Sequence, residues 1–283
     1  MWTESLTERV ERAKRLDSVG RKLSLAFADA VRPGRTKDLL AGTWLGHPAH
    51  PMLTDLPIGA WTSALILDLV AGRQARRAAD ALVVVGVLAA VPTAATGLSD
   101  LADVVNPDER SIGTAHALGN VTAVMLFGGS YLARRRGRRE VGVRLAMLGA
   151  AVVAGAGFLG GHLAYRKGVG VDQTVFRGRL EDWTPVLDEW ELPEAKARRV
   201  SAGGTDVLLY RRHDSIYALA NRCSHRGGPL HKGRVSDGRI RCPWHLSTFS
   251  LQDGLVLQGP ATAPQPCYQV RLRDGSIEVR DHR

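Results

Sequence analysis

Two cysteines and two histidines in the last quarter of the chain have the residue types and spacing of metal ligands. Cys223 and His225 form a C-x-H pair, and Cys242 and His245 form a C-x-x-H pair. Two thiolates and two imidazoles on two tight loops can hold either a tetrahedral zinc ion or a [2Fe–2S] cluster. The spacing favours iron, because each loop can give one sulfur to one iron and one nitrogen to the other. A zinc site more often takes both cysteines from one turn and both histidines from another.

The region of about residues 192–280 resembles a Rieske [2Fe–2S] protein, and its stretches "RGGPL" and "PWH" are also typical of that family. The resemblance implies a small all-β domain holding a [2Fe–2S] cluster that carries one electron at a time. It also implies that Cys223 and Cys242 bind one iron, while His225 and His245 bind the outer iron near solvent.

Residues around these ligands bear on the reduction potential. Pro264 lies in "GPATAPQP", which resembles the proline-rich third loop that shields the cluster in this family. Ser247 matches the family serine that donates to a bridging sulfide. Trp244 and Gly228 stand where high-potential relatives carry a disulfide, and Phe249 replaces the usual tyrosine. Fewer hydrogen bonds to sulfur stabilise the reduced cluster less, so we expect a potential in the lower, ferredoxin-like part of the Rieske range.

The bulk composition narrows the class of protein. The 283 residues carry a net charge of +10, which favours acidic partners or anionic lipid. No nucleic-acid-reading motif accompanies the basic residues, so we expect no nucleic-acid partner. The three cysteines all lie late in the chain, which argues against a disulfide framework, and Cys267 is expected to be a buried or free thiol. Nothing at the N-terminus has the form of a cleavable signal.

Four apolar stretches ahead of the metal-ligand motif predict membrane helices. Each is close to the ~20 residues that a helix needs to cross a bilayer. They are residues 53–72, 81–99, 112–133 and 145–165. Before them, residues 4–31 have the pattern of one or two amphipathic helices that end at "RPG". Two alternatives stay open for these helices, which either lie on an anionic membrane surface or pack on the protein itself.

The chain up to about Gly170 resembles a family of bacterial membrane domains that have four helices and no assigned function. The resemblance rests on "LLAGTWLGHPAHPMLTDLPIGAWTSALILDL", "ATGLSDL", "AHALGN" and "GGHLAYRKG". It therefore supports the four-helix interpretation and implies no chemistry.

The loops between the apolar stretches predict an orientation in a bacterial plasma membrane. Arginines fill the first–second and third–fourth loops, which the positive-inside rule places in the cytoplasm. The C-terminal domain would then lie at the outer face, although the basic N-terminal tail argues the other way. Asp68 lies near the arginine-rich loops, where it either relays protons or pairs with their arginines, and we expect the pairing.

Four histidines are predicted to meet at the opposite membrane face, namely His47, His50, His116 and His162. Ionisable residues within a membrane are costly and often functional. One hypothesis is that they hold a haem b, another metal or a quinone, with His116 and His162 as the preferred ligand pair. The alternative is that they cap helices or bond to lipid headgroups.

Together these observations predict an α+β multidomain chain, a four-helix transmembrane bundle followed by a small all-β Rieske domain. The expected boundaries are an N-terminal segment 1–45, a membrane domain 46–170, a linker 171–191 and a Rieske domain 192–283. The predicted function is single-electron transfer, coupled to a proton at the outer histidines, with an acidic redox protein or a quinone as partner. The alternatives are a membrane quinol or small-molecule oxidoreductase and a redox sensor.

Overall fold

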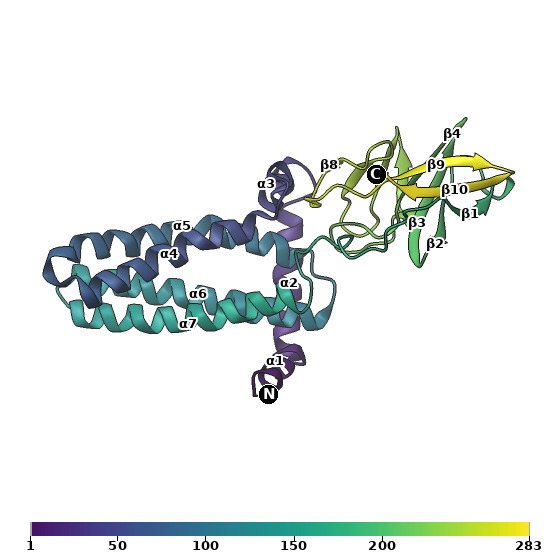
Figure 1. Ribbon diagram of the computed structural model, residues 1–283. Coiled ribbons are helices and arrows are strands. Elements are labelled where there is room, and N and C mark those ends of the chain that lie inside the picture. Colours follow the sequence, from purple (N-terminus) through teal and green to yellow (C-terminus); the bar gives the residue numbers. More distant parts are fainter. Residues whose placement is uncertain (1, 283) are drawn as a thin grey trace. The chain divides into compact units, whose positions relative to one another are not determined.

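The computed structural model describes residues 2–282, which form two compact units. One unit is helical and takes in the chain up to Arg32 together with Pro48–Val169. The other is mainly β and takes in Pro33–His47 together with the chain from Gly170 on (Figure 1). The segment 33–47, most of which we expected within the N-terminal segment, thus folds with the β unit.

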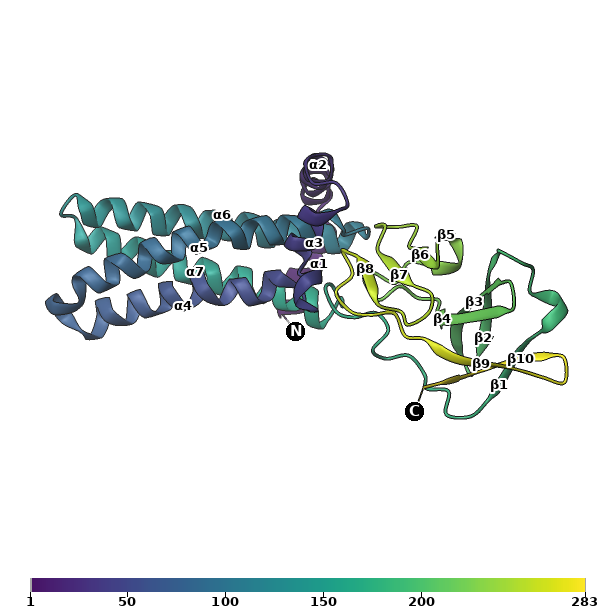
Figure 2. The same cartoon turned by 90° about the horizontal axis from the view of Figure 1, so that it is seen from above.

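The long helices of the first unit run side by side as a bundle (Figures 1 and 2). They are α4 (Ala49–Val70), α5 (Arg76–Ala102), α6 (Pro107–Arg135) and α7 (Arg139–Tyr165), and the 3-10 turn η2 (Gly72–Ala75) joins the first two. Asn106 caps α6, because its side chain accepts a hydrogen bond from the Asp108 N–H at 2.9 Å. Pro107 fills the first position of that helix, where the backbone needs no N–H donor.

The predicted amphipathic helices are α1 (Trp2–Glu11) and α2 (Lys14–Ala30). They pack on the protein, α2 against α5 and α6, and α1 against α6. Arg110 Nη2 lies 2.6 Å from Asp17 Oδ1, and the Ser24 hydroxyl donates to the Leu101 carbonyl at 3.2 Å. These contacts agree with the second alternative for this stretch, that its helices pack on the protein itself.

Within residues 2–282, three helical stretches are long and apolar enough to cross a membrane. They are Ala49–Val70, Gly72–Ala102 and Arg139–Tyr165. The predicted third span, residues 112–133, lies within α6, which does not meet this criterion. Polar groups such as His116 and Asn120 inside α6, and Arg134 near its end, lower the hydropathy of that helix. Three of the four predicted spans therefore coincide with helices that could cross a membrane by length and composition, and the count of four is not confirmed.

The helix pairs α4–α5 and α6–α7 are built alike at one layer of the bundle. His50 in α4 and His116 in α6 make corresponding contacts within their respective helix pairs. Each bonds through Nδ1 to a carbonyl of the next helix, His50 to Thr93 at 3.0 Å and His116 to Ala156 at 2.7 Å. Since a carbonyl only accepts, Nδ1 carries the proton in both rings. The two pairs thus use corresponding positions at this layer.

A second layer repeats the same correspondence with aromatic rings. Trp61 and Phe127 have the same sequence separation as His50 and His116, and they stack with centroids 4.2 Å apart and planes 5° from parallel. Each ring lies against a glycine of the next helix. A Cβ on Gly86 would come within 2.3 Å of Trp61, and one on Gly149 within 2.9 Å of Phe127. Glycine at these two positions lets each pair of helices approach closely.

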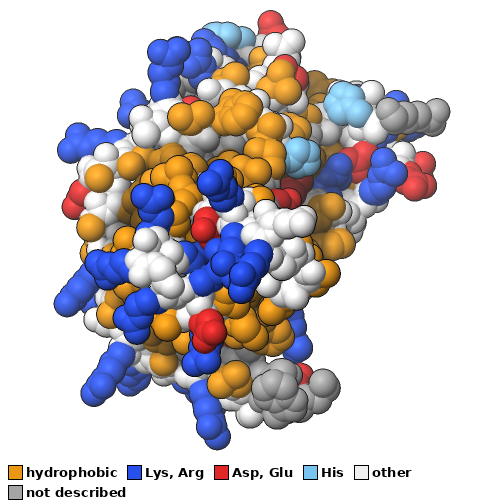
Figure 3. Space-filling view, turned by 90° about the vertical axis from the view of Figure 1, so that its left-hand side faces the viewer, with side chains coloured by type: hydrophobic (Ala, Val, Ile, Leu, Met, Phe, Trp, Pro, Cys, Tyr) orange, Lys and Arg blue, Asp and Glu red, His pale blue; other side chains and the backbone are white. Residues whose placement is uncertain are grey.

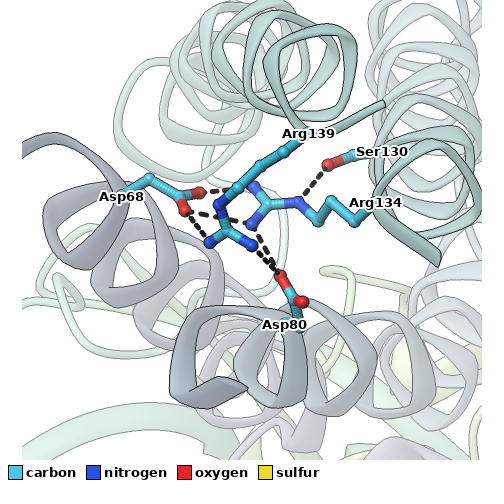
Figure 4. Close-up of polar contacts among 5 residues, drawn as sticks. All are labelled: Asp68, Asp80, Ser130, Arg134 and Arg139. Carbon is cyan, nitrogen blue, oxygen red and sulfur yellow. Dashed lines mark hydrogen bonds and ion pairs between the residues drawn. The ribbon is translucent and has the colours of Figure 1, made fainter. Parts of the chain in front are cut away.

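A buried ion-pair network joins α4, α5, α6 and α7 at the end of the bundle near η2 (Figure 4). Arg134 in α6 pairs with Asp68 in α4, and its Nη1 lies 3.0 Å from Oδ1 of Asp80 in α5. Arg139 in α7 contacts the same two carboxylates, at 2.5 Å from Asp68 and 3.0 Å from Asp80. Arg134 Nε also donates to the Ser130 hydroxyl at 3.0 Å. The prediction that Asp68 pairs with loop arginines is confirmed.

Basic side chains surround this end of the molecule (Figure 3). The exposed arginines of the two connections are Arg73, Arg76, Arg77, Arg135, Arg136 and Arg138. Because Asp68 and Asp80 are engaged with Arg134 and Arg139, those carboxylates do not offset the exposed arginines. This end of the bundle is therefore strongly positive.

The second unit holds a small β domain, as predicted. Within the described residues its antiparallel sheets have the strand orders β1-β10-β9, β2-β3-β4 and β5-β6-β7-β8. The strands are β1 (Thr184–Asp188), β2 (Ala197–Ala202), β3 (Thr205–Arg212), β4 (Ser215–Ala220), β5 (Arg234–Ser236), β6 (Arg239–Arg241), β7 (Thr248–Ser250), β8 (Val256–Gln258), β9 (Tyr268–Arg273) and β10 (Ser276–Asp281). The 3-10 turns are η3 (Glu189–Glu191) and η4 (Leu230–Lys232), and α3 (Arg35–Ala41) with η1 (Thr43–Leu45) completes the unit.

Strand β3 separates two hydrophobic cores. Its side chains alternate, so that Val207 and Leu209 face one core, while Leu208 and Tyr210 face the other. The second core includes both cysteines of the predicted metal site. The packing of β3 therefore places the metal-ligand loops against a closed apolar layer.

Replacing Asp68 with asparagine should destabilise the bundle by about 3–5 kcal/mol, because it removes one partner of a buried ion pair. Thermal unfolding of the full-length protein in detergent measures this change. Glu140→Gln is the matched control, since Glu140 lies in an exposed pair with Arg144 at 3.9 Å and should contribute less than about 1 kcal/mol. Equal midpoints for the two variants would contradict the importance of the network.

Candidate metal centre

The four predicted ligands lie on two loops of the β unit, Cys223 and His225 on one, Cys242 and His245 on the other. The first loop follows β4 and closes on itself, since the Cys223 N–H donates to the Gly228 carbonyl at 2.9 Å. The second joins β6 to β7, and there the Cys242 N–H donates to the Ser247 carbonyl at 2.8 Å. A Cβ on Gly228 would lie 2.8 Å from Cys242 Sγ, so the two loops meet at this glycine.

The side chains of these loops form two pairs. The His225 and His245 ring centroids are 5.1 Å apart, with planes at 89°. Metal–nitrogen bonds of about 2 Å place two imidazoles on one tetrahedral metal with centroids about 5 Å apart, so this pair fits a single metal. Cys223 and Cys242 are both buried, and their thiols are hydrogen-bonded to each other.

Paired ligands suit a cluster of two bridged irons better than a single ion. In a Rieske cluster each iron takes only two side chains, because sulfides complete its coordination. The donor set, with sulfur in one pair and nitrogen in the other, therefore fits a [2Fe–2S] group.

Burial and neighbouring groups set the protonation of these side chains. The hydrogen bond between the thiols, with burial, raises the pKa of Cys223 well above its usual range, and the same bond lowers the pKa of Cys242 to about 7. Burial, reinforced by the positive charges of Arg226 and Lys37, lowers the pKa of His225 well below its usual range. His225 is therefore neutral at pH 7, the form in which an imidazole binds metal.

A buried glutamine holds the third loop against the first. Gln265 is 1% exposed. Its Oε1 accepts from the Ser224 N–H at 2.9 Å, and its Nε2 donates to the carbonyls of Ala220 and Arg222, both at 2.7 Å. These bonds fix the backbone on both sides of Cys223. We did not identify Gln265 from the sequence, where its only signal is a lone amide in a proline-rich run.

The surface beside His245 is apolar and open to solvent. Trp244 is 49% exposed and Leu246 37% exposed, and the Trp244 and His245 rings lie 6.4 Å apart at 84°. Pro264, on the third loop, is also exposed. The loops that bury the cysteines thus leave an apolar surface at one imidazole.

Two further residues of this region have separate environments. Ser247 is fully buried, and its hydroxyl oxygen accepts from the Ala261 N–H at 3.0 Å. Cys267 is a half-buried free thiol, and burial together with the charge of Asp253 raises its pKa to about 11. The expectation of a buried or free thiol at Cys267 is consistent with this environment.

The helical unit contains three of the four predicted histidines, His50, His116 and His162. His50 and His116 are neighbours, with ring centroids 6.2 Å apart and planes at 86°. Their rings lie against Gly97 and Gly160, where a Cβ would come within 2.7 Å and 3.0 Å of the respective imidazole. Asn120 Nδ2 lies 3.2 Å from Nε2 of His116. Hydrogen bonds within the bundle thus engage these two rings.

The other two histidines have different partners. His162 Nε2 lies 3.2 Å from Oε1 of Glu11, which also pairs with Lys167 Nζ at 2.8 Å. His47 is exposed and belongs to the β unit, whereas the others belong to the helical unit. These contacts support neither a haem site nor a quinone site within the described residues. The predicted ligand pair thus has separate polar partners, Ala156 for His116 and Glu11 for His162.

Comparison with known proteins matches two families to separate parts of the chain. The Rieske [2Fe–2S] domain matches residues 182–269, and a predicted membrane protein family (DUF2231) matches residues 46–173. The anthranilate 1,2-dioxygenase ferredoxin subunit of Burkholderia cepacia is 33% identical over 102 residues, which are 35% of this chain and 93% of the relative.

Human apoptosis-inducing factor 3 is 34% identical over 90 residues, 32% of this chain, and the chain spans only 15% of that protein's length. Among solved structures, the ferredoxin of carbazole 1,9a-dioxygenase from Nocardioides aromaticivorans IC177 is 26% identical. It aligns with 36% of this chain and all of its own, at a TM-score of 0.34.

The β unit and its metal-ligand loops thus define an iron–sulfur domain of the electron-carrying class. The chain belongs to the Rieske [2Fe–2S] family and carries a DUF2231 membrane domain ahead of its Rieske domain.

Replacing Gln265 with leucine should destabilise the β unit by about 3 kcal/mol, since it leaves one buried N–H and two buried carbonyls without this partner. Urea unfolding of the full-length protein, followed by near-ultraviolet circular dichroism, measures the loss. Gln252→Leu is the control, because Gln252 is exposed. Unchanged stability in the Gln265 variant would show that the third loop is held by other contacts.

Proposed function

We propose that the chain is a membrane-anchored carrier of single electrons whose [2Fe–2S] cluster is held by Cys223, Cys242, His225 and His245. The supporting observation is the meeting of a buried thiol pair and an imidazole pair, ring centroids 5.1 Å apart, on adjacent loops of a Rieske domain. The cluster supplies reversible one-electron chemistry when bound.

The protein's own side chains exclude water and handle a proton. The cysteines lie in the apolar second core, which keeps solvent from their iron. An imidazole that binds a metal through one nitrogen keeps a proton on the other. His225 and His245 can therefore release or take up that proton as the charge on their iron changes. Exposed Trp244 and Leu246 give a partner an apolar contact beside His245.

The partner is an acidic redox protein. From Pro193 to the C-terminus the chain has 15 lysines and arginines against 8 aspartates and glutamates. Such a surface attracts an acidic protein and makes the association rate depend on salt. The relatives that are named ferredoxin subunits of dioxygenases support a partner of the oxidoreductase class.

The bundle anchors the carrier in a bacterial plasma membrane through four helices. We include α6 as the fourth span, because it packs along α5 and α7 and keeps its charged residues at its two ends. Four spans place both ends of the bundle's chain on one side of the membrane. The exposed arginines of the opposite end favour the cytoplasm, and this supports a Rieske domain at the outer face.

A second candidate function is a quinol or small-molecule oxidoreductase with its active site at the membrane histidines. The adjacency of His50 and His116 is the observation behind it, and it requires the rings to exchange their bonds to the Thr93 and Ala156 carbonyls for a substrate. In this case electrons would pass from a reduced quinol to the Rieske cluster.

Replacing Cys223 or Cys242 with serine should abolish the Rieske electron paramagnetic resonance signal of the dithionite-reduced protein and remove most of its iron. A lost thiolate ligand leaves one iron short of its coordination. Cys267→Ser is the matched control and should keep both the signal and two irons per chain. Retention of the signal in the Cys223 or Cys242 variant would refute the ligand assignment.

The optical spectrum of the detergent-purified protein separates the two functions. A pure carrier should show the broad Rieske bands without a Soret band, and a reduced quinol should leave its cluster oxidised in proteoliposomes. Reduction of the cluster by quinol, lost in His50→Ala and His116→Ala, would establish the oxidoreductase instead.

A further inference from the structure

A short helical segment from the N-terminal part of the chain folds onto the Rieske domain. We call residues 35–45, which comprise α3 and η1, the N-terminal clasp. The clasp belongs to the same compact unit as the Rieske loops. It lies outside both family matches, which cover residues 46–173 and 182–269. Its contact partners on the third loop, Gly259 and Ala261, lie within the Rieske match.

The clasp holds the start of the third loop by two hydrogen bonds. Asp38 Oδ1 accepts from the Gly259 N–H at 2.9 Å, and the Thr43 hydroxyl donates to the Ala261 carbonyl at 3.1 Å. The approach is close, because a Cβ on Gly259 would come within 2.2 Å of the Thr43 hydroxyl oxygen. Only a glycine at 259 leaves room for the clasp in this position.

These bonds continue to Ser247, on the loop that carries Cys242 and His245. The Ala261 N–H donates to the Ser247 hydroxyl oxygen at 3.0 Å, and both residues are fully buried. The Ala261 N–H cannot accept a hydrogen bond, so the O–H of Ser247 is directed to another acceptor. By the Rieske resemblance, Ser247 is the serine that donates to a bridging sulfide.

A buried positive charge lies in the same segment. Lys37 is only 6% exposed, and its charge acts on His225. Positive charge and hydrogen bonds near an iron–sulfur cluster stabilise the reduced state, which carries one more electron. The clasp thus brings both a positive charge and hydrogen bonds to the cluster loops.

We propose that the N-terminal clasp acts as a fourth cluster loop, in which Thr43 is a positioning residue that holds Ser247 through Ala261 and so raises the reduction potential of the cluster. This inference rests on the proposed function, because it assumes the cluster at Cys223, His225, Cys242 and His245. It means that the potential depends on a segment that ends at Leu45, just ahead of the first membrane helix.

The test is a redox titration of the full-length protein in detergent, monitored by electron paramagnetic resonance. Thr43→Val should lower the equilibrium constant for reduction by up to about tenfold, about 59 mV for one electron, in the same direction as Ser247→Ala. Thr43→Ser keeps the hydroxyl and should retain the wild-type potential. Thr36→Val is the matched control, since Thr36 is an exposed residue of α3.

The double variant decides whether Thr43 acts through Ser247. In the Ser247→Ala background, Thr43→Val should have no further effect, because the group that it positions is gone. A wild-type potential for Thr43→Val, or a shift that adds fully to that of Ser247→Ala, would overturn the inference. If Thr43→Val fails to fold, Asp38→Ala is used in its place. That variant frees the same loop at Gly259, and the same outcomes decide.

The proposed function and the role of the clasp are contradicted by different results. A wild-type protein that shows no Rieske signal would overturn the proposed function, whereas a normal wild-type signal with an insensitive potential would overturn only the role of the clasp.

Discussion

The hydrogen bonds of Gln265 and Ser247 fix the positions of the metal-centre loops relative to one another. Gln265 joins the third loop to the backbone on both sides of Cys223, and Ser247 joins the second loop to Ala261. Both side chains are buried, so each lost bond would leave a polar group without water. A metal site built on loops has little secondary structure to fix it, and these side chains supply that rigidity.

The same constraint governs the helical unit. In a bilayer core a polar group has no water to bond, so it must find its partner within the protein. His50 and His116 reach carbonyls of neighbouring helices, and Arg134 reaches two carboxylates and a hydroxyl. Each of these bonds crosses from one helix to another except that to Ser130. Polar residues therefore join the bundle helices at layers where apolar packing alone would not specify their register.

Short sequence motifs predicted those features that residues close together in the chain determine. The spacing of Cys223, His225, Cys242 and His245 identified the Rieske domain, and the arginine-rich loops identified the partners of Asp68. The clasp could not be predicted, because Thr43 and Ala261 are 218 positions apart and no periodicity connects them. The same reason hid the contact of His162 with Glu11, 151 positions away. The count of four spans is not confirmed, because polar residues such as His116 and Asn120 keep the mean hydropathy of α6 below that of the other three helices.

The correspondence between the two helix pairs limits how such a bundle can arise. Two identical hairpins associating about a twofold axis would place a residue beside that axis opposite its own copy. A histidine pair and an aromatic stack, like those of His50 with His116 and Trp61 with Phe127, would survive that arrangement. The ion pair of Asp68 and Arg134, which has the same sequence separation, would not survive in a homodimer. The two positions would then carry the same residue, so like charges would be buried there. Opposite charges at this position require two hairpins free to differ in sequence, as fusion of a duplicated hairpin into one chain allows.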